Sequence, residues 1–174
     1  MTAPSKFAHV VYNTHRYDEM IDWYLKVFEA RVQHRDERLA FLTYDEEHHR
    51  LALIADPRVQ QSVPDVSAPG LDHFAYTYAS FDDLLATYER LRAAGIVPYW
   101  TINHGPTTSL YYRNPDGINV ELQIDNLSDP EALSAWMRSE AFLANPIGEN
   151  IDFEDLAARY RAGASLDDLL VRRG

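Results

Sequence analysis

The 174-residue chain contains no cysteine. It can therefore form neither disulfide bonds nor thiolate ligands, so its fold depends on a hydrophobic core and any metal must be bound by nitrogen and oxygen atoms. Basic residues are scarce as well: 16 Lys and Arg stand against 27 Asp and Glu, a formal net charge of −11. Because nucleic-acid binding depends on clustered Lys and Arg, we expect no nucleic acid among the partners.

Long hydrophobic runs are also missing. No stretch approaches the ~18 apolar residues that a membrane span needs, and residues 1–6 lack a charged-then-apolar signal pattern. We therefore expect a cytoplasmic protein with no membrane partner. The composition, with 46% hydrophobic and 25% charged residues, is typical of a folded domain. The length allows one well-cored domain or two small modules that share a core.

A short sequence pattern at the start of the chain recurs near its middle. The runs 6–12 and 70–78 each place one histidine, His9 and His73, in a β-type sequence. Each run is followed by a helix-type apolar pattern and then by three further β-type runs. The pattern predicts an α+β fold of two βαβββ modules that bury their exposed sheet faces in one shared domain.

The expected elements follow from local patterns. Module one, residues 5–56, is predicted to contain strands at 7–12, 30–34, 39–44 and 49–55, with a helix over 17–28. Module two, residues 70–125, is predicted to contain strands at 71–78, 98–103, 109–113 and 117–124, with a helix from 81 to Gly95. Residues 56–69, with three prolines, are interpreted as a linker, and residues 126–174 as an extension with helices at 130–137, 153–161 and 165–170.

Two histidines and one carboxylate on three predicted strands form a candidate metal site. These residues are His9, His73 and Glu121. An imidazole pair with one carboxylate can hold a divalent metal and leave coordination positions open, which suits non-haem Fe(II) chemistry. The alternative is that each is a hydrogen-bonded core residue. A carboxylate between Val120 and Leu122 is harder to explain in that way, because an unpaired charge is costly to bury.

The two modules with these three residues resemble the vicinal oxygen chelate superfamily, which includes glyoxalase I and the bleomycin-resistance proteins, over residues 5–125. Within that superfamily, the run Glu47-His-His-Arg-Leu-Ala-Leu53 and the stretch from His104 to Glu121 are similar to signatures of type I extradiol ring-cleaving dioxygenases. The resemblance implies a catechol-type substrate, dioxygen as co-substrate, and Fe(II) as cofactor. Mn(II) could replace Fe(II), since nitrogen and oxygen ligands accept both.

The resemblance also implies roles for three further residues. By position in the family's motifs, His49 is the acid–base group, Tyr111 hydrogen-bonds a ligand oxygen, and His104 is an additional pocket histidine. Alternation along a predicted strand favours His49 over His48 and separates Tyr111 from Tyr112, since neighbouring side chains on a strand point to opposite faces.

Many enzymes of this family carry two such domains, whereas this chain has one with a helical extension. The missing wall of the site must come from the extension or from another subunit, so we expect a homodimer or a larger homo-oligomer. Two alternatives stay open. One is a non-redox metalloenzyme of the glyoxalase type, which normally uses a fourth protein ligand; the run 49–55 offers no carboxylate for it. The other is a metal-free protein that binds an aromatic drug.

Overall fold

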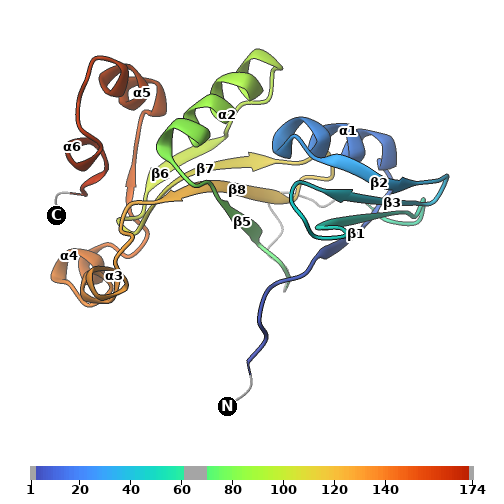
Figure 1. Ribbon diagram of the computed structural model, residues 1–174, viewed down its shortest axis with the longest axis horizontal. Helices are drawn as coiled ribbons and strands as arrows, with labels where there is room; N and C mark the ends of the chain where they lie inside the picture. The colour runs from blue at the N-terminus through green and yellow to red at the C-terminus, as the bar shows by residue number, and fades with distance from the viewer. Residues whose placement is uncertain (1–2, 61–69, 173–174) are drawn as a thin grey trace. The chain divides into compact units, whose positions relative to one another are not determined.

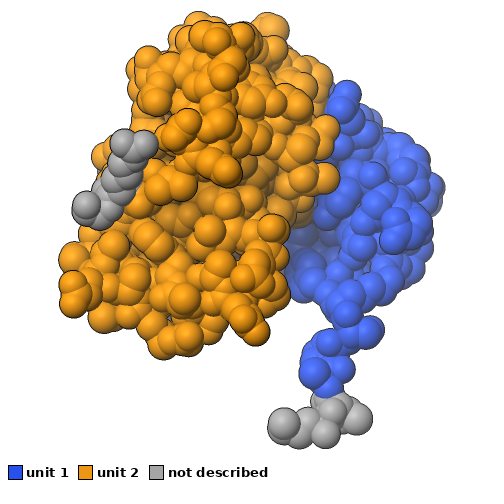
Figure 2. Space-filling view, turned by 60° about the vertical axis from the view of Figure 1, so that its left-hand side comes forward, with its two compact units in different colours: residues 1–70, 114–118 blue, residues 71–113, 119–174 orange. Residues whose placement is uncertain are grey.

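Two mixed β-sheets, each accompanied by a helix, form the α+β fold that the sequence predicts (Figure 1). The computed structural model describes residues 3–60 and 70–172. Its contacts divide the chain into two units (Figure 2). Unit 1 comprises Met1–Gly70 with Asn114–Ile118, and unit 2 comprises Leu71–Arg113 with Asn119–Gly174.

Unit 1 contains a four-stranded sheet with the order β1-β4-β3-β2. The outer strand β1 runs parallel to β4, and the remaining pairs are antiparallel. Its elements are β1 (Val10–Thr14), α1 (Tyr17–Phe28), β2 (Arg31–Arg35), β3 (Leu39–Thr43) and β4 (Leu51–Ala55).

The helix α1 covers one face of this sheet. Met20, Ile21, Tyr24 and Val27 recur at the helical spacing of one apolar stripe and are fully buried. The strand residues on the covered face are equally buried, whereas the opposite face carries the more exposed Val11. Burial of one helical stripe and one sheet face makes the core of unit 1.

Unit 2 repeats this arrangement with the strand order β5-β8-β7-β6, followed by β9. Ser80 caps the helix of this unit, since its hydroxyl accepts a hydrogen bond from the Asp83 amide at 3.1 Å. Because the first and fourth strands are again parallel neighbours, the predicted repeat is confirmed. The elements are β5 (His73–Thr77), α2 (Phe81–Ala93), β6 (Trp100–Asn103), β7 (Thr107–Arg113) and β8 (Asn119–Asp125).

The C-terminal extension belongs to unit 2. The three predicted helices are present as α3 (Pro130–Trp136), α5 (Phe153–Arg161) and α6 (Leu166–Leu170). Two elements were not predicted: α4 (Glu140–Ala144) and β9 (Glu149–Asn150), which pairs with β6. A two-residue strand is too short to produce a periodic pattern, so only pairing with β6 reveals it. In the described part of the chain, no helix combines the length and apolar character of a membrane span.

Several predicted strands begin later than expected, and two of these shifts affect predicted site residues. β1 starts at Val10 rather than at residue 7, and β4 starts at Leu51 rather than at residue 49. The reason at β4 is a turn built on Asp45, whose carboxylate accepts hydrogen bonds from the Glu47 amide and from the Arg50 guanidinium. His9, His48 and His49 therefore precede strands rather than lie within them. Most of the predicted linker, residues 61–69, lies outside the described residues.

Candidate active site

Three of the predicted site residues share one face of the sheet in unit 2. Tyr111 on β7 lies directly opposite Glu121 on β8, and Glu121 is also paired with Ala75 on β5. His73 is two residues before Ala75, so its side chain points to the same face. Tyr112 lies on the other face, which α2 covers, and is fully buried. The predicted separation of the two tyrosines by strand alternation is thus confirmed.

Glu121 and His73 are in direct contact. The Glu121 side chain is 5% exposed, and its Oε2 lies 3.0 Å from His73 Nε2. This neighbour accounts for the buried carboxylate, which would be costly without a partner. The opposite nitrogen of the ring, Nδ1, lies 2.6 Å from Oδ2 of Asp72. No role was predicted for Asp72 from the sequence, although this acidic residue directly precedes His73.

Tyr111 and His104 form a second pair beside Glu121. The Tyr111 hydroxyl lies 3.1 Å from His104 Nε2, and the same nitrogen lies 3.9 Å from Glu121 Oε1. Burial, and then the negative charge of Glu121, raise the pKa of Tyr111 above its ordinary value. The hydroxyl therefore keeps its proton at neutral pH. Trp100 on β6 stacks on the Tyr111 ring with 4.7 Å between the ring centroids.

The remaining predicted residues lie in unit 1. The His9 and His49 rings are 4.3 Å apart between centroids, and Phe41 stacks on His49 at 4.5 Å. Burial, followed by the charges of His9 and His48, lowers the pKa of His49, so the ring is held neutral and can accept a proton. His48 has its side chain 67% exposed.

The strand-alternation argument that favoured His49 over His48 was wrong. Both residues belong to the turn before β4, and their Nδ1 atoms are only 2.6 Å apart. Alternation applies within a strand and cannot separate neighbours in a turn. What distinguishes the two rings is their surroundings, because His49 lies between His9 and Phe41 while His48 faces solvent.

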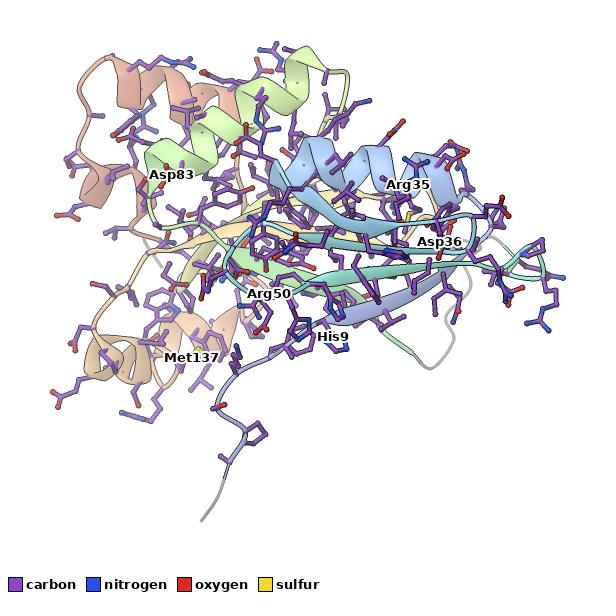
Figure 3. All side chains as sticks on the ribbon, turned by 45° about the vertical axis from the view of Figure 1, so that its right-hand side comes forward. His9, Arg35, Asp36, Arg50, Asp83 and Met137 are labelled. Atoms are coloured by element: carbon purple, nitrogen blue, oxygen red, sulfur yellow. The ribbon has the colours of Figure 1, made fainter. Side chains whose placement is uncertain are left out.

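Arg50 holds this turn against the segment that carries His9 (Figure 3). Its Nη1 donates to the backbone oxygens of Phe7 and Ala8 at 2.6 and 3.0 Å, and its Nε donates to the Asp45 carboxylate at 2.9 Å. One partly buried guanidinium thus connects the backbone before β1 with a carboxylate in the turn before β4. This connection holds the segment before His9 beside the turn that carries His49.

The donor set fits a non-haem metal, because imidazole nitrogens and a carboxylate are ligands that divalent iron and manganese accept. His73 and Glu121 already present a nitrogen and an oxygen 3.0 Å apart. Among residues 3–60 and 70–172, however, no three His, Asp or Glu side chains form a group arranged to hold a metal ion. His9 belongs to unit 1 and the other two residues to unit 2. The three-ligand set stays a prediction.

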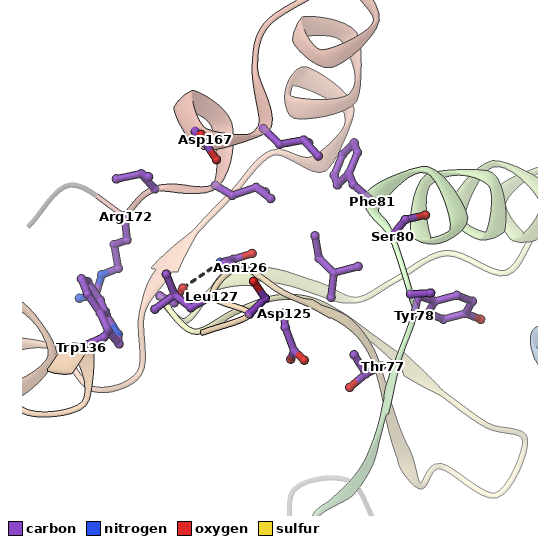
Figure 4. A pocket seen from close by; sticks show the side chains of 17 residues that line it. Thr77, Tyr78, Ser80, Phe81, Asp125, Asn126, Leu127, Trp136, Asp167 and Arg172 are labelled. Atoms are coloured by element: carbon purple, nitrogen blue, oxygen red, sulfur yellow. Dashed lines mark hydrogen bonds between the residues drawn. The ribbon is translucent and has the colours of Figure 1, made fainter. Parts of the chain in front are cut away.

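A cavity of about 710 Å³ opens elsewhere in unit 2, between the sheet and the C-terminal extension (Figure 4). The ends of β5 and β8, the start of α2, Trp136 and Arg172 contribute to its lining. His73, His104, Tyr111 and Glu121 are not among its lining residues. This cavity is therefore separate from the residues that carry the predicted chemistry.

Comparison with known proteins places these features in context. The sequence profile described as "Glyoxalase/Bleomycin resistance protein/Dioxygenase superfamily" matches residues 6–122. The chain is 45% identical to "Biphenyl-2,3-diol 1,2-dioxygenase 2" of Rhodococcus globerulus, over 96% of this chain and 87% of that protein. It is 40% identical to "Biphenyl-2,3-diol 1,2-dioxygenase 3" of the same organism, over 99% of this chain and 90% of that protein.

Solved structures show the same fold at lower identity. A glyoxylase/bleomycin resistance protein/dioxygenase domain from a Frankia species matches with a TM-score of 0.60 and 22% identity, over 73% of this chain and 96% of that chain. A lactoylglutathione lyase from Agrobacterium tumefaciens matches with a TM-score of 0.55 and 21% identity, over 71% of this chain and 96% of that chain. These two matches show that the chain shares its fold with both proteins.

Proposed function

The chain belongs to the glyoxalase/bleomycin resistance protein/dioxygenase superfamily, and we propose that it is an extradiol dioxygenase that opens a catechol-type ring with dioxygen. Two relatives with 45% and 40% identity, each over nearly the whole chain, are biphenyl-2,3-diol 1,2-dioxygenases. This full-length similarity supports biphenyl-2,3-diol or a related catechol as the substrate. The observation that carries the chemistry is the group on one sheet face, where Glu121 meets His73 and Tyr111 meets His104.

Such an activity implies a non-haem metal, and we propose Fe(II) held by His9, His73 and Glu121, with Mn(II) as a possible substitute. The ion would supply adjacent coordination positions for the two catechol oxygens and dioxygen, together with the redox chemistry of ring opening. Support comes from the chemistry of the donors and from the buried pair of His73 and Glu121. Asp72 would orient His73 through Nδ1, as carboxylates commonly do for metal-binding histidines.

The other residues would handle protons and orient the substrate. A catechol must lose protons to chelate a metal, and the neutral imidazole of His49 can accept one. Tyr111 keeps its own proton, so its hydroxyl can donate one hydrogen bond and accept others from a ligand oxygen. His104 holds the Tyr111 hydroxyl at 3.1 Å. The stacked rings of Trp100 and Tyr111 add apolar surface beside these groups.

The glyoxalase-type alternative is weakened by the strand register. Val11 and Ala75 each lie two residues after the histidine of their module, and they pair with Ala52 and Glu121 respectively. The position in unit 1 that corresponds to Glu121 is therefore an alanine, which cannot bind a metal. A metal-free drug-binding protein would have no use for a buried carboxylate facing two histidines.

The activity is tested by loading metal-free protein anaerobically with Fe(II) and mixing it with 2,3-dihydroxybiphenyl or catechol in air-saturated buffer. We expect a yellow ring-opened product, followed by its visible absorbance. Protein loaded with Zn(II), which has no redox chemistry, is the control and should give no colour. If the iron-loaded protein forms no product from any of several catechols, the proposal is wrong. If the protein takes up no metal at all, the result favours the alternative of a metal-free protein that binds an aromatic drug.

We also infer that the protein is a homodimer or a larger homo-oligomer. The C-terminal extension exposes several large apolar side chains, among them Leu133, Met137 and Leu143. Exposed apolar groups in one segment are typical of a surface that another chain covers. Size-exclusion chromatography with light scattering tests this inference, and a particle of 20 kDa at working concentration would contradict it.

A further inference from the structure

The segment 145–150 of the C-terminal extension contacts the ring of His104. His104 Nδ1 is hydrogen-bonded to the backbone oxygen of Ile147. A carbonyl oxygen can only accept, so Nδ1 is the nitrogen that carries the proton. In a neutral imidazole the other nitrogen, Nε2, is then an acceptor, and it faces the Tyr111 hydroxyl at 3.1 Å. The extension therefore selects which side of the ring meets Tyr111.

The segment is built to hold this carbonyl in place. Asn145 closes it internally, because its Nδ2 donates to the Gly148 oxygen at 2.7 Å and its Oδ1 accepts from the Gly148 amide at 3.1 Å. Gly148 has a φ of +115°, and a Cβ there would lie 2.3 Å from the Asn103 oxygen and 2.7 Å from the His104 Cα. The backbone can approach His104 this closely only with glycine at position 148.

A second contact from the same segment reaches the neighbouring aromatic. Asn150 on β9 accepts a hydrogen bond from Trp100 Nε1 at 2.7 Å, and Trp100 stacks on Tyr111. β9 is anchored by its pairing with Ile102 and Asn103. Residues 145–150 thus hold two of the side chains that touch Tyr111, one by a backbone oxygen and one by a side chain.

We propose that the segment 145–150 is a positioning element of the active site, and that the Ile147 carbonyl fixes His104 with its proton on Nδ1, so that Nε2 orients the Tyr111 hydroxyl. The Tyr111 proton then faces acceptors of the protein itself, His104 Nε2 and the Glu121 carboxylate, so the lone pairs of the Tyr111 oxygen are left to receive a hydrogen bond from a hydroxyl of the substrate. This role in turnover rests on the proposed function. The tautomer itself does not, because it follows from contacts within the protein.

The test compares three single variants with the parent protein. Gly148→Ala forces the segment away from His104, and Asn145→Ala removes the two hydrogen bonds that close it. Ile147→Ala is the matched control, because it deletes a side chain that is 62% exposed and leaves the carbonyl in place. Circular dichroism checks that each variant is folded, and Asn145→Ala remains informative if Gly148→Ala does not fold.

The first readout is the tautomer of His104 in metal-free, substrate-free protein, measured by ¹⁵N NMR of the imidazole nitrogens. The signals are assigned by their loss in His104→Gln. We expect proton-bearing Nδ1 in the parent and in Ile147→Ala, and a mixture of tautomers in Gly148→Ala and Asn145→Ala. A proton on Nε2 in the parent, or an unchanged tautomer in both disrupted variants, would overturn the proposal.

The second readout is steady-state kinetics of the iron-loaded proteins. Outer partners that orient the groups around a metal site are each worth about 10- to 100-fold in activity, and we expect a loss of kcat of that order in Gly148→Ala and Asn145→Ala, with Ile147→Ala unchanged. Equal activity in all three variants would show that the contact has no role in turnover. If the parent is inactive but has the expected tautomer, the proposed function fails and the assignment of the His104 tautomer stands.

Discussion

Tyr111 and Glu121 form a directly opposed pair on the antiparallel strands β7 and β8. Ten positions separate them along the chain, yet the turn at 114–117 brings them to the same face of the sheet. There the Glu121 charge and burial together keep the Tyr111 hydroxyl protonated. A buried acid and a neutral hydroxyl therefore lie side by side, and both are beside histidines.

Tyr111→Phe should bind metal normally but turn over about 100-fold more slowly, because it lacks the hydroxyl that contacts a ligand oxygen. Tyr112→Phe is the matched control on the other face. In the described residues the Tyr112 hydroxyl is buried without a hydrogen-bond partner, so its removal should leave kcat unchanged and stabilise the fold by up to about 1 kcal/mol. Kinetics and urea unfolding measure both effects. Equal losses of kcat in the two variants would show that altered side-chain packing, and not the Tyr111 hydroxyl, causes the loss.

His73→Ala and Glu121→Gln should each abolish stoichiometric metal loading, because each removes one of the three proposed ligands. His34→Ala provides the control, since its ring lies on β2 beside Asp36 and is about half exposed. Metal content after anaerobic loading and desalting is measured by mass spectrometry. Full metal occupancy in Glu121→Gln would exclude the proposed ligand set.

His49→Ala should keep its metal and lose at least about 100-fold in kcat, since it removes the group proposed to accept the catechol proton. His48→Ala should retain most of its activity, because that ring faces solvent. The two variants remove the same chemical group from adjacent positions, so a difference between them reports on position. The reverse result, with His48→Ala the slower enzyme, would transfer the proton-accepting role to His48.

Asp45→Asn should lower the free energy of unfolding at pH 7 by about 1 kcal/mol, because Asp45 is bonded to the partly buried Arg50. The Arg50 guanidinium lowers the pKa of Asp45 below its ordinary value of 3.8. The pair therefore stabilises the fold fully above pH 3.8, and this stabilisation is lost as the pH falls through the lower folded-state pKa.

Urea unfolding of parent and variant at several pH values measures this difference, which should shrink below pH 3.8. Asp18→Asn breaks an exposed pair with Arg35 and should change the free energy of unfolding less. A difference between parent and Asp45→Asn that stays constant down to pH 2 would rule out the ion pair as its cause.

Gly105→Ala should destabilise the fold by about 1–3 kcal/mol through overpacking. A Cβ at this position, where φ is +100°, would lie 2.4 Å from the indole ring of Trp136 in α3. Gly95→Ala is the control, because Gly95 also has a positive φ but no atom within 4 Å of its added Cβ. The difference in unfolding free energy between the variants measures how tightly the extension packs. No difference would indicate that α3 moves aside freely.

Hydrophobic periodicity and turn residues were sufficient to predict the two βαβββ modules and three helices of the extension from the sequence. These features are local: alternation within β7, the Asn114–Gly117 turn and the capping serine at Ser80 each act over a few residues. The same local rules separated Tyr111 from Tyr112. They failed at His48 and His49, where the Asp45 turn overrides the pattern of a strand.

Only the tertiary structure shows which residues far apart in the chain are in contact. Arg50 reaches the backbone at residues 7 and 8, and Ile147 meets a ring 43 positions earlier. A backbone carbonyl has the same chemistry in every residue, so no sequence pattern marks the one that holds His104. The sequence by itself determined which side chains could carry the chemistry, and folding decided which atoms position them.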